Sequence, residues 1–468
     1  MGQARIQIQV MPENQFPIGS EIVISSHLAK RLGIGSQTIN IQHGSANVSA
    51  MLSLSANPSS LVRICSSLAT ALKLTDAIQL NVQYHPQQLT LSFGPLVGIM
   101  INLENNQQHK PVFGEMARFF DECFKAAQQA GIRLFIFTPE QLSMERKTIR
   151  GWSKFRGRWI ETNHPLPHVI YNRITSRRIE EDSSLQKQLD QLRKKHQVQI
   201  FNEQFLNKWE VHQLFSQDSY ISEILPETKP YDWRTLLDMA KSHPILYLKP
   251  VNGSLGQGII RLIHTPIQIR YQSETAQGNQ TFYAHSWKKV IQRLNRRIGK
   301  QSYLIQQGLL LIKHLGRPID FRILCQKNHQ GKWSVTSAVG RIGKTEHFVS
   351  NLARGGMILA ASNVLDNFIH SSKPTIQQLH EIALNIANRF DQLTSGHFAE
   401  LGIDLGLDRK GKVWLIEINS KPSKTDDSVV QITSGIRPSV RKLTSYICFL
   451  TGIKQTRSFA QKRRKKGD

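Results

Sequence analysis

Residues 397–423 carry the sequence HFAELGIDLGLDRKGKVWLIEINSKPS, in which apolar and polar residues alternate on either side of a turn at residues 408–411. Alternation around a short polar turn is typical of a β-hairpin. A hairpin centred on this turn pairs Asp404 with Glu417, and directly opposed residues lie on the same face of a sheet. Three apolar residues are expected to pack behind the carboxylates: Trp414, Ile416 and Ile418.

The polar face of this hairpin gathers oxygen ligands. Asn419 lies two residues after Glu417 and therefore points to the same side of the sheet. Carboxylate and amide oxygens are the donors that Mg²⁺ prefers, usually together with the phosphates of a nucleotide. Two carboxylates held face to face without a cation would repel each other. The pattern predicts a magnesium site at Asp404, Glu417 and Asn419, with a solvated polar face as the alternative.

A glycine-rich segment lies upstream, PILYLKPVNGSLGQGII at residues 244–260. Lys249 ends a predicted strand, and the loop that follows contains Gly253, Ser254, Gly256 and Gly258. Glycines let backbone N–H groups approach oxyanions closely, and the lysine ammonium neutralises their charge. The pattern is neither a Walker A loop nor the dinucleotide-binding fingerprint. It predicts either a phosphate-binding loop or an ordinary glycine hairpin.

A third segment, RPIDFRILCQ at residues 317–326, alternates as a strand does. Its apolar face consists of Ile319, Phe321, Ile323 and Cys325. Because an apolar face fixes the register, Asp320 and Arg322 must project together from the other face. They form either an intramolecular ion pair or a charged fork that is offered to phosphate or carboxylate.

Taken in order, these segments resemble the ATP-grasp superfamily, whose members bind ATP between two small sheets. The resemblance covers roughly residues 207–452 and implies ATP and Mg²⁺ as cofactors. The residues implied to contact the triphosphate are Lys208 of NKWEVHQLF, Lys249, Gly253, Ser254, Gly256 and Gly258. The segment LIQQGLLLI resembles the hinge strand that contacts adenine, which implies Gln307, Gly308 and Leu309. Relatives often have an acidic residue where Gln307 stands.

The same resemblance implies residues that act on the reacting phosphate. Arg322 and Arg341 resemble the arginines that face the phosphates. The segment SNLARGG resembles the one near the γ-phosphate, and it contributes Asn351 together with Gly355 and Gly356. Asp404, Glu417 and Asn419 fall on the metal-ligand positions. Lys421 stands where many relatives have a small residue, and it either contacts an anionic substrate or pairs with an acid.

The chain is expected to be a multidomain α/β (α+β) protein. Residues 1–95 contain a repeat, since EIVISSHLAKRLGIGSQTINI from Glu21 recurs as SLVRICSSLATALKLTDAIQLNV from Ser60. Each copy has a strand, a short helix and a strand, which predicts a small pseudo-symmetric β-barrel. Residues 96–206 predict a Rossmann-like α/β domain that precedes the ATP-grasp domain of residues 207–452.

Two basic segments suggest contact with anionic partners. The segment RKTIRGWSKFRGRWIE at residues 146–161 interleaves cations with aromatic residues, as single-stranded nucleic acid sites do, but an ordinary exposed hairpin is the favoured interpretation. Residues 453–468 form a basic tail that is expected to be disordered and that is a candidate for docking on nucleic acid, protein or another polyanion. The chain has 60 Lys and Arg against 34 Asp and Glu, a formal charge of +26, which also favours such partners.

Composition excludes several classes of protein. No apolar run reaches the roughly 18 residues that a membrane span needs. The four cysteines are far apart and include no CxxC pair, which argues against a zinc knuckle or a redox motif and favours a reducing compartment. We therefore expect a cytoplasmic protein that is not exported.

The layout of the whole chain resembles the YheC/YheD family of spore-coat-associated proteins with an ATP-grasp domain. The matching segments are FGPLVGI at residues 93–99, PLPHVIYNR at residues 165–173 and KWEVHQLF followed by LPET. The resemblance implies an endospore-forming bacterium and association with its coat. The family fixes no substrate, but the resemblance to ATP-grasp ligases implies a carboxylate–amine or carboxylate–thiol ligase that acts through an acyl phosphate. The alternative is a non-catalytic, nucleotide-binding coat protein that docks on anionic partners.

Overall fold

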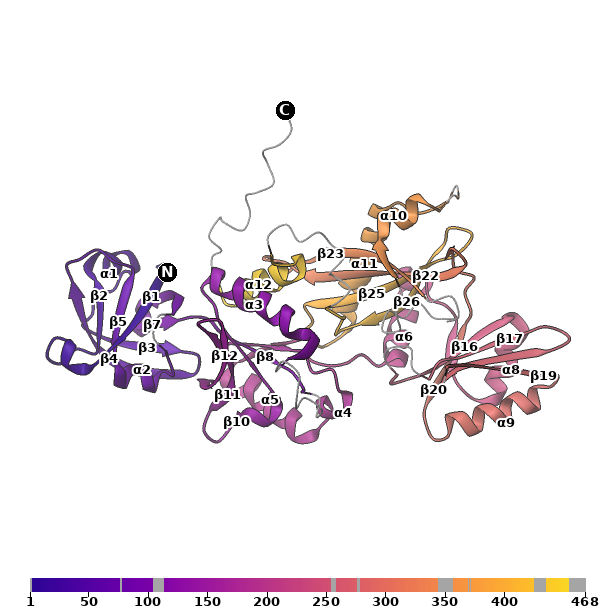
Figure 1. Ribbon diagram of the computed structural model, residues 1–468, viewed down its shortest axis with the longest axis horizontal. Coiled ribbons are helices and arrows are strands. Elements are labelled where there is room, and N and C mark those ends of the chain that lie inside the picture. The colour runs from indigo at the N-terminus through magenta and orange to yellow at the C-terminus, as the bar shows by residue number, and fades with distance from the viewer. Residues whose placement is uncertain are drawn as a thin grey trace, which may run out of the picture. The chain divides into compact units, whose positions relative to one another are not determined.

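The computed structural model describes residues 2–75, 78–103, 113–253, 258–275, 278–343, 357–368, 370, 372–424 and 435–453 (Figure 1). The chain forms two compact units. The first contains residues 1–204, 327–332 and 432–468, and the second contains residues 205–326 and 333–431. No helix within the described ranges is both long enough and apolar enough to cross a membrane.

The N-terminal part of the first unit is a closed barrel of strands in the order β1-β5-β2-β4-β3-β7-β6. Its elements are β1 (Gln3–Met11), β2 (Ile22–Ser25), α1 (Ser26–Leu32), β3 (Thr38–His43), β4 (Ala46–Ser55), β5 (Leu61–Cys65), α2 (Ser66–Ala71), β6 (Gln79–His85) and β7 (Thr90–Phe93). The succession β2-α1-β3-β4 recurs as β5-α2-β6-β7, which confirms the predicted repeat and barrel. Alternate strand residues such as Ile6 and Ile8 fill its interior.

The second part of the first unit is the predicted α/β domain. Its elements are β8 (Leu96–Met100), α3 (Ala117–Ala130), β9 (Arg133–Phe137), β10 (Leu142–Ser143), β11 (Thr148–Phe155), β12 (Arg158–Pro165), β13 (Val169–Asn172), α4 (Arg177–Glu180), α5 (Ser183–His196) and β14 (Gln199–Phe201). Strands β9, β8, β13 and β14 are parallel neighbours. Helix α3 ends at Gly131, whose φ of 68° is left-handed and suits glycine.

The basic aromatic segment forms the β11-β12 hairpin of this domain. Its aromatic rings pack inward, with Trp152 and Trp159 at centroid distances of 5.7 and 4.7 Å from Phe113. The Lys154 ammonium lies 2.6 Å from a carboxylate oxygen of Asp121. Because the rings that would stack on bases are used in packing, the structure supports the ordinary hairpin rather than a nucleic-acid site.

The last described helix, α12 (Pro438–Leu450), packs against α3 in the first unit, although the sequence analysis assigns it to the C-terminal domain. A buried ion pair fixes its start. The Arg437 backbone N–H and Nε both donate to Oε2 of Glu122 at 2.9 Å, and Nη2 donates to Oε1 at 3.0 Å. Residues from the far end of the chain therefore complete the α/β domain.

Removing Glu122 is expected to release α12. The change Glu122→Ala leaves the buried Arg437 guanidinium without its carboxylate, which costs about 3–5 kcal/mol. Hydrogen exchange of the α12 amides measures the effect and should become much faster. The double change Glu122→Leu with Arg437→Met is the control, since it removes both charges and should restore most of the protection. Unchanged exchange in the single variant would contradict the assigned contact.

The second unit contains two sheets. The first has the strand order β15-β20-β16-β17-β18-β19, and the second has the order β24-β23-β22-β25-β26, with β21 paired to β22. The strands are β15 (Thr228–Pro230), β16 (Ile245–Pro250), β17 (Ile260–His264), β18 (Ile269–Thr275), β19 (Gly278–Ala284), β20 (Tyr303–Gln307), β21 (Lys313–His314), β22 (Arg317–Lys327), β23 (Trp333–Ile342), β24 (Met357–Ala360), β25 (Glu400–Leu407) and β26 (Val413–Asn419).

Helices of the second unit cover these sheets. They are α6 (Lys208–Ser216), α7 (Ser219–Ser222), α8 (Trp233–Ser242), α9 (Trp287–Ile298), α10 (Ala361–Asp366) and α11 (Ile376–Leu393). Helices α8 and α9 share a core with the first sheet that includes Leu248 and Leu294. Helix α11 buries Phe390 in the core of the second sheet beside Phe321. The unit is thus a pair of sheets, each with its own apolar core.

Candidate functional site

The β25-β26 hairpin has the predicted pairing, with Asp404 directly opposite Glu417. The register then slips, because Leu405 pairs with Leu415 and leaves Ile416 as an extra residue in β26. Such a bulge reverses the alternation of the strand. The prediction that Trp414 and Ile416 pack behind the carboxylates was therefore wrong. Both are half-buried, and the buried residues of the strand are Val413, Leu415 and Ile418.

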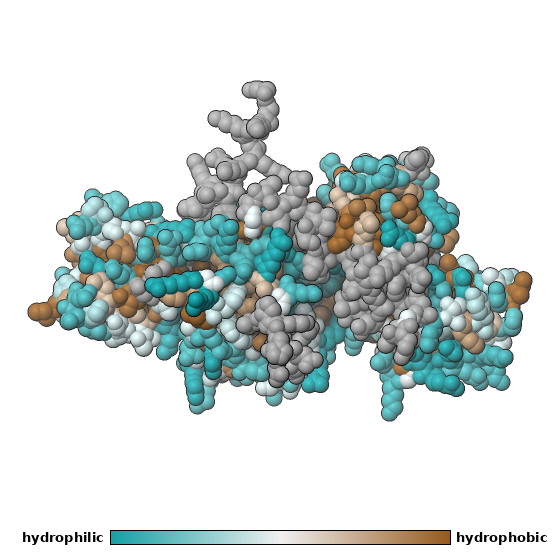
Figure 2. Space-filling model, in the orientation of Figure 1, coloured by the Kyte–Doolittle hydropathy of each residue, from teal (hydrophilic) through white to brown (hydrophobic). Residues whose placement is uncertain are grey.

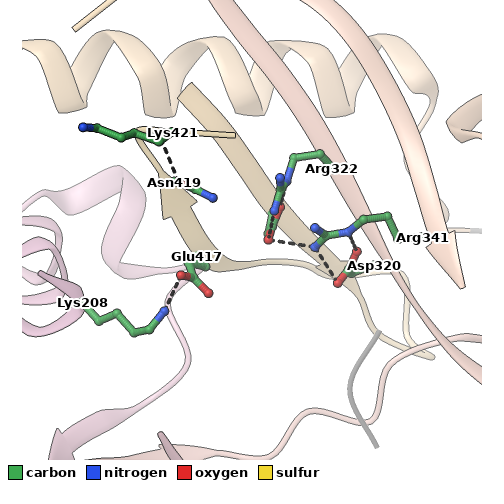
Figure 3. A network of polar contacts seen from close by, with 8 residues as sticks. Lys208, Asp320, Arg322, Arg341, Glu417, Asn419 and Lys421 are labelled. Carbon is green, nitrogen blue, oxygen red and sulfur yellow. Dashed lines mark hydrogen bonds and ion pairs between the residues drawn. The ribbon is translucent and has the colours of Figure 1, made fainter. Parts of the chain in front are cut away.

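Asp404 belongs to a buried ion-pair network with Arg322, Arg341 and Asp320, and Figure 3 labels the last three. Arg322 lies directly opposite Asp404 across β22 and β25, and its guanidinium donates to both oxygens, with Nη2 2.8 Å from Oδ2. Arg341 donates to Asp320 through Nε and Nη2 at 2.6 and 2.9 Å, and Nη2 also lies 2.8 Å from Oδ2 of Asp404. Arg322 thus pairs with Asp404 across the sheet, while Asp320 pairs with Arg341.

Charge in this network shifts the pKa of its members. Burial alone would raise the pKa of Asp404, but Arg322 and Arg341 outweigh it and hold that pKa at about 2. Burial opposes the charge of Arg341, and Asp320 and Asp404 overcome it and raise the pKa of Arg341 well above its usual value. Asp404 and Arg341 therefore stay ionised at neutral pH.

Gly402 makes room for this arrangement. A Cβ atom there would lie 3.2 Å from Cδ of Arg322 and 3.0 Å from Cβ of Pro422. A larger residue at position 402 would push the arginine away from its carboxylate partner. The sequence analysis did not single out this glycine, because only the pairing of β22 with β25 shows what it faces.

Removing Arg341 is expected to destabilise the second unit. Arg341→Met takes away three of the bonds that hold Asp320 and Asp404, and breaking a buried charge cluster in this way costs about 3–5 kcal/mol. Urea unfolding with fluorescence detection measures the change. Arg409→Met provides the control, because Arg409 is exposed in the turn of the same hairpin. Equal stability of the two variants would contradict the structural role of Arg341.

Two lysines approach the carboxylates from other elements. Asn207 caps helix α6 by accepting the N–H groups of Trp209 and Glu210, and this positions Lys208 at its first turn. The Lys208 ammonium donates to Oε1 of Glu417 (Figure 3). Glu417 is the more exposed partner, since its side chain retains 40% of its accessible surface. This carboxylate is therefore open to a ligand while Asp404 is enclosed.

Lys249 projects from β16, and its ammonium donates to Oε1 of Gln306. Burial and the charge of Lys208 together lower the pKa of Lys249 to about 8, although Glu417, Asp404 and Asp320 oppose the shift. Gln306 in turn donates to Oγ1 of Thr228 at 3.0 Å. Gln306 therefore orients the ammonium, and the sequence analysis did not identify it.

A pocket in the second unit joins these groups. Its polar lining consists of Lys208, His212, Thr228, Lys249, Gln306 and Glu417. Its apolar lining consists of Leu206, Val211, Phe215, Leu225, Pro226, Leu304, Leu415, Ile416 and Ile418. A mainly apolar cavity whose lining includes two lysines has the two features that a base and its phosphates require. The pocket combines α6, both sheets and the extra residue of the β26 bulge.

The predicted adenine contacts lie beside this pocket rather than in its lining. The backbone N–H of Gln307 donates to Glu227 at 2.8 Å, and that of Gly308 donates to Ile245 at 2.8 Å. Those two N–H groups are thus used in the sheet. Because Lys249 pairs with Leu304, the residue two further along, Gln306, shares the face of Lys249. Leu309 is half-buried.

Only part of the predicted phosphate loop is described. Gly258 has a φ of 75°, and a Cβ atom there would lie 2.9 Å from Pro250 and 3.0 Å from the Tyr303 hydroxyl, so glycine is required. The Gly253 N–H donates to Pro250. Several predicted residues lie outside the described ranges: Ser254, Gly256, Asn351, Gly355, Gly356 and the tail from residue 454.

Asn419, the remaining predicted metal ligand, is the last residue of β26, and a backbone N–H just after the strand fixes its side chain. Its Oδ1 accepts the backbone N–H of Lys421 at 2.9 Å (Figure 3). The Lys421 side chain is buried, and its ammonium lies 4.7 Å from the centroid of the Phe205 ring. Lys421 is therefore held against an aromatic face, as cations often are.

The donor set fits Mg²⁺ together with phosphate oxygens. Two opposed carboxylates and an amide oxygen lie on neighbouring strands, and all are hard oxygen donors. Among the residues that the structure describes, no cluster of three or more His, Cys, Asp or Glu could hold a metal alone. Both oxygens of Asp404 already accept bonds from Arg322 and Arg341, so Glu417 is the carboxylate of this set that is open to a cation.

The sequence matches the family model for YheC/D-like ATP-grasp domains over residues 197–450. The endospore coat-associated protein YheD of Bacillus subtilis (strain 168) is 31% identical over 339 residues, which are 72% of this chain and 74% of YheD. The endospore coat-associated protein YheC of the same organism is 25% identical over 319 residues, or 66% of this chain and 85% of YheC.

Solved structures also resemble this chain. D-alanyl-alanine synthetase A from Vibrio cholerae has a TM-score of 0.43 at 10% identity and covers 77% of this chain and 98% of its own. N5-carboxyaminoimidazole synthetase from Staphylococcus aureus, complexed with ADP, has a TM-score of 0.44 at 11% identity and covers 78% of each chain.

Proposed function

Because the chain belongs to the family of YheC/D-like ATP-grasp proteins, we propose that it binds ATP with Mg²⁺ in the pocket of its second unit. We propose further that it uses them to join a carboxylate to an amine or a thiol. The observation that supports this is the gathering of cations and carboxylates around one apolar pocket. Lys208, Lys249 and Glu417 line the pocket. The buried network of Arg322, Arg341 and Asp404 adjoins it, because Asp404 pairs with Glu417 across the β25-β26 hairpin.

In this proposal the cations of the chain neutralise the triphosphate. Lys208 and Lys249 bind phosphate oxygens, and Arg322 and Arg341 stabilise charge on the transferred phosphoryl group. As the resemblance implies, we propose that Gly253, Ser254, Gly256 and Gly258 bind the phosphates and that Asn351 acts at the γ-phosphate. We propose that Gln307, Gly308 and Leu309 contact adenine through groups other than the N–H groups of Gln307 and Gly308, which bond within the sheet. Asp404, Glu417 and Asn419 hold Mg²⁺, which as a Lewis acid supplies further charge neutralisation.

The proposed reaction needs no protein nucleophile. A substrate carboxylate oxygen bonds to the γ-phosphorus while the bond to the β-phosphate oxygen breaks, which gives an acyl phosphate and ADP. The amine or thiol then bonds to the carbonyl carbon, phosphate leaves with the bonding electrons, and a proton passes to solvent. The chain's contribution is to position the two reactants and to exclude water, both of which raise the rate substantially.

Hydroxylamine tests this proposal without knowledge of the natural amine. It captures an acyl phosphate as a hydroxamate, so the protein is incubated with Mg·ATP, hydroxylamine and pools of carboxylic acids. We expect hydroxamate and ADP to form in equal amounts with at least one pool. Nucleotide binding without hydroxamate from any pool would contradict the ligase proposal and favour a non-catalytic protein.

A non-catalytic coat protein is the second candidate, and the net charge of +26 favours it. In that case the nucleotide site serves only to stabilise one conformation, and the basic surface and tail dock on anionic partners such as coat proteins or other polyanions. Either candidate is proposed to act in the cytoplasm of an endospore-forming bacterium and to associate with the spore coat. The names of YheD and YheC state coat association for those proteins.

A further inference from the structure

Helix α9 has one apolar face and one strongly basic face. Its sequence is WKKVIQRLNRRI, and Val290, Leu294 and Ile298 are buried in the core of the first sheet of the second unit. The exposed positions hold five cations: Lys288, Lys289, Arg293, Arg296 and Arg297. The surface over α9 in Figure 2 is accordingly hydrophilic. The apolar face of α9 packs in the core, whereas its basic face has no role in packing.

The surroundings of α9 supply little opposite charge. Residues 275–319 contain eight Lys and Arg and no Asp or Glu. The Arg293 guanidinium lies over the rings of Tyr271 and Phe282, at 5.3 and 4.8 Å from their centroids. Within the described ranges, Lys288, Lys289 and Arg296 take part in no ion pair or hydrogen bond. Three cations therefore face solvent with their charge uncompensated.

The cations at the start of α9 lower the stability of the helix, whereas Arg296 and Arg297 in its last turn favour it. Lys288 and Lys289 lie in the first turn, where the helix dipole disfavours cations. The side chain of Ser286, the N-cap residue, accepts no hydrogen bond from a backbone N–H of the first turn. Lys289 and Arg293 are four residues apart, and like charges at that spacing repel each other. An arrangement that costs helix stability is consistent with a binding role for the cations.

We propose that the basic face of α9 is a docking site for an acidic polypeptide segment. Lys289, Arg293 and Arg296 form a row about 10 Å long on one side of the helix. Side chains at alternate positions of an extended peptide are about 7 Å apart, so two or three carboxylates match this row. Gln292, which is also exposed on this face, can donate to the peptide backbone.

The same face is poorly suited to other anionic partners. Its exposed positions are cations and amides, so it offers no apolar side chain for insertion into a bilayer. Trp287, at the start of the helix, is half-buried beside His264, at a centroid distance of 5.5 Å. It is therefore not a stacking platform for bases. A row this short also spans few phosphates of a nucleic acid, whose affinity depends on many such contacts.

Fluorescence anisotropy with a labelled oligoglutamate peptide tests the proposal on the full chain. The variant Lys289→Glu with Arg296→Glu should weaken binding at least tenfold. The control variant Lys187→Glu with Lys195→Glu makes the same change in net charge at exposed positions of α5 and should weaken it less than twofold. Wild-type binding should fall steeply as salt increases, because it rests on exposed charge.

Three outcomes would overturn the proposal. Equal losses in the two variants would show that net charge alone binds the peptide. Tighter and α9-dependent binding of a DNA duplex would assign the face to nucleic acid. Tighter and α9-dependent binding of vesicles made of phosphatidylglycerol and phosphatidylcholine in equal parts would assign it to membranes. A melting curve checks folding, and the variant Lys288→Glu should melt no lower than the wild type, since an acid in the first turn favours the helix.

Discussion

Lys249→Met is expected to abolish the binding of Mg·ATP and at the same time to stabilise the free protein. The ammonium of Lys249 is enclosed beside Lys208, and burial lowers its pKa to about 8. The positive charge of Lys249 destabilises the free protein, but it stabilises the complex once the phosphates of ATP are bound. We expect a loss of affinity of at least a hundredfold. We expect the unfolding free energy of Lys249→Met to exceed that of the wild type by about 2 kcal/mol. This is less than the pKa shift of Lys249 alone implies, because part of the lysine side chain is exposed.

The stability difference between wild type and Lys249→Met should depend on pH. Below pH 8 the lysine is protonated in both folded and unfolded states, so the folded wild type bears the full cost of the buried charge. Between about pH 8 and the ordinary value of 10.5 the unfolded chain binds more protons, so the stability of the wild type rises with pH. The advantage of the variant should therefore shrink through this range and vanish above it.

The affinity for Mg·ATP should also depend on the protonation of Lys249. Phosphate favours the protonated lysine, so Mg·ATP affinity of the wild type should fall above about pH 8, with uptake of a proton on binding. Calorimetry in buffers of different ionisation enthalpy measures that uptake. Lys241→Met is the control, because Lys241 is exposed on α8. If Lys249→Met binds Mg·ATP as tightly as the wild type does, Lys249 is not a phosphate ligand.

Glu417→Gln is expected to remove Mg·ATP binding while leaving the fold intact. The amide keeps the shape of the side chain but loses the charge that faces Lys208 and that Mg²⁺ requires. Since the Glu417 side chain is 40% exposed, its loss should change the unfolding free energy by less than about 1 kcal/mol. We expect hydroxamate formation to fall by at least a hundredfold.

Glu210→Gln is the matched control, since Glu210 is exposed on α6, the helix that carries Lys208. It should bind Mg·ATP and form hydroxamate as the wild type does. Mn²⁺ in place of Mg²⁺ allows metal binding to be followed directly by electron paramagnetic resonance. Nucleotide-dependent Mn²⁺ binding that survives in Glu417→Gln would refute the assigned metal ligands.

The sequence contained the pairing of Asp404 with Glu417, because a short polar turn and strict alternation determine a hairpin register. The bulge at Ile416 could not be predicted from the sequence, because apolar and polar residues still alternate along β26 when one extra residue is present. For the same reason the buried side of β26 was assigned wrongly. The barrel was predictable from its internal repeat, in which each copy has the same order of elements.

Contacts between distant segments could not be predicted from spacing. Gln306 shares a face with Lys249 only because β20 pairs with β16 in one particular register. Arg341 reaches Asp320 and Asp404 from a third strand, so the ion pairs of the site depend on the strand order of the sheet. The contact of Arg437 with Glu122 joins segments that are 315 residues apart, and the pattern of neither segment indicates the other.

Calorimetric titration of Mg·ATP into the wild-type protein, with and without EDTA, tests the central claim most directly. We expect saturable binding at one site per chain that disappears when the metal is chelated. The pocket that contains Lys249 and Glu417 would then be a nucleotide site, and a search for the carboxylate and amine is justified. If the protein shows a normal melting transition but binds no Mg·ATP, the pocket is not a nucleotide site and the proposed function is wrong.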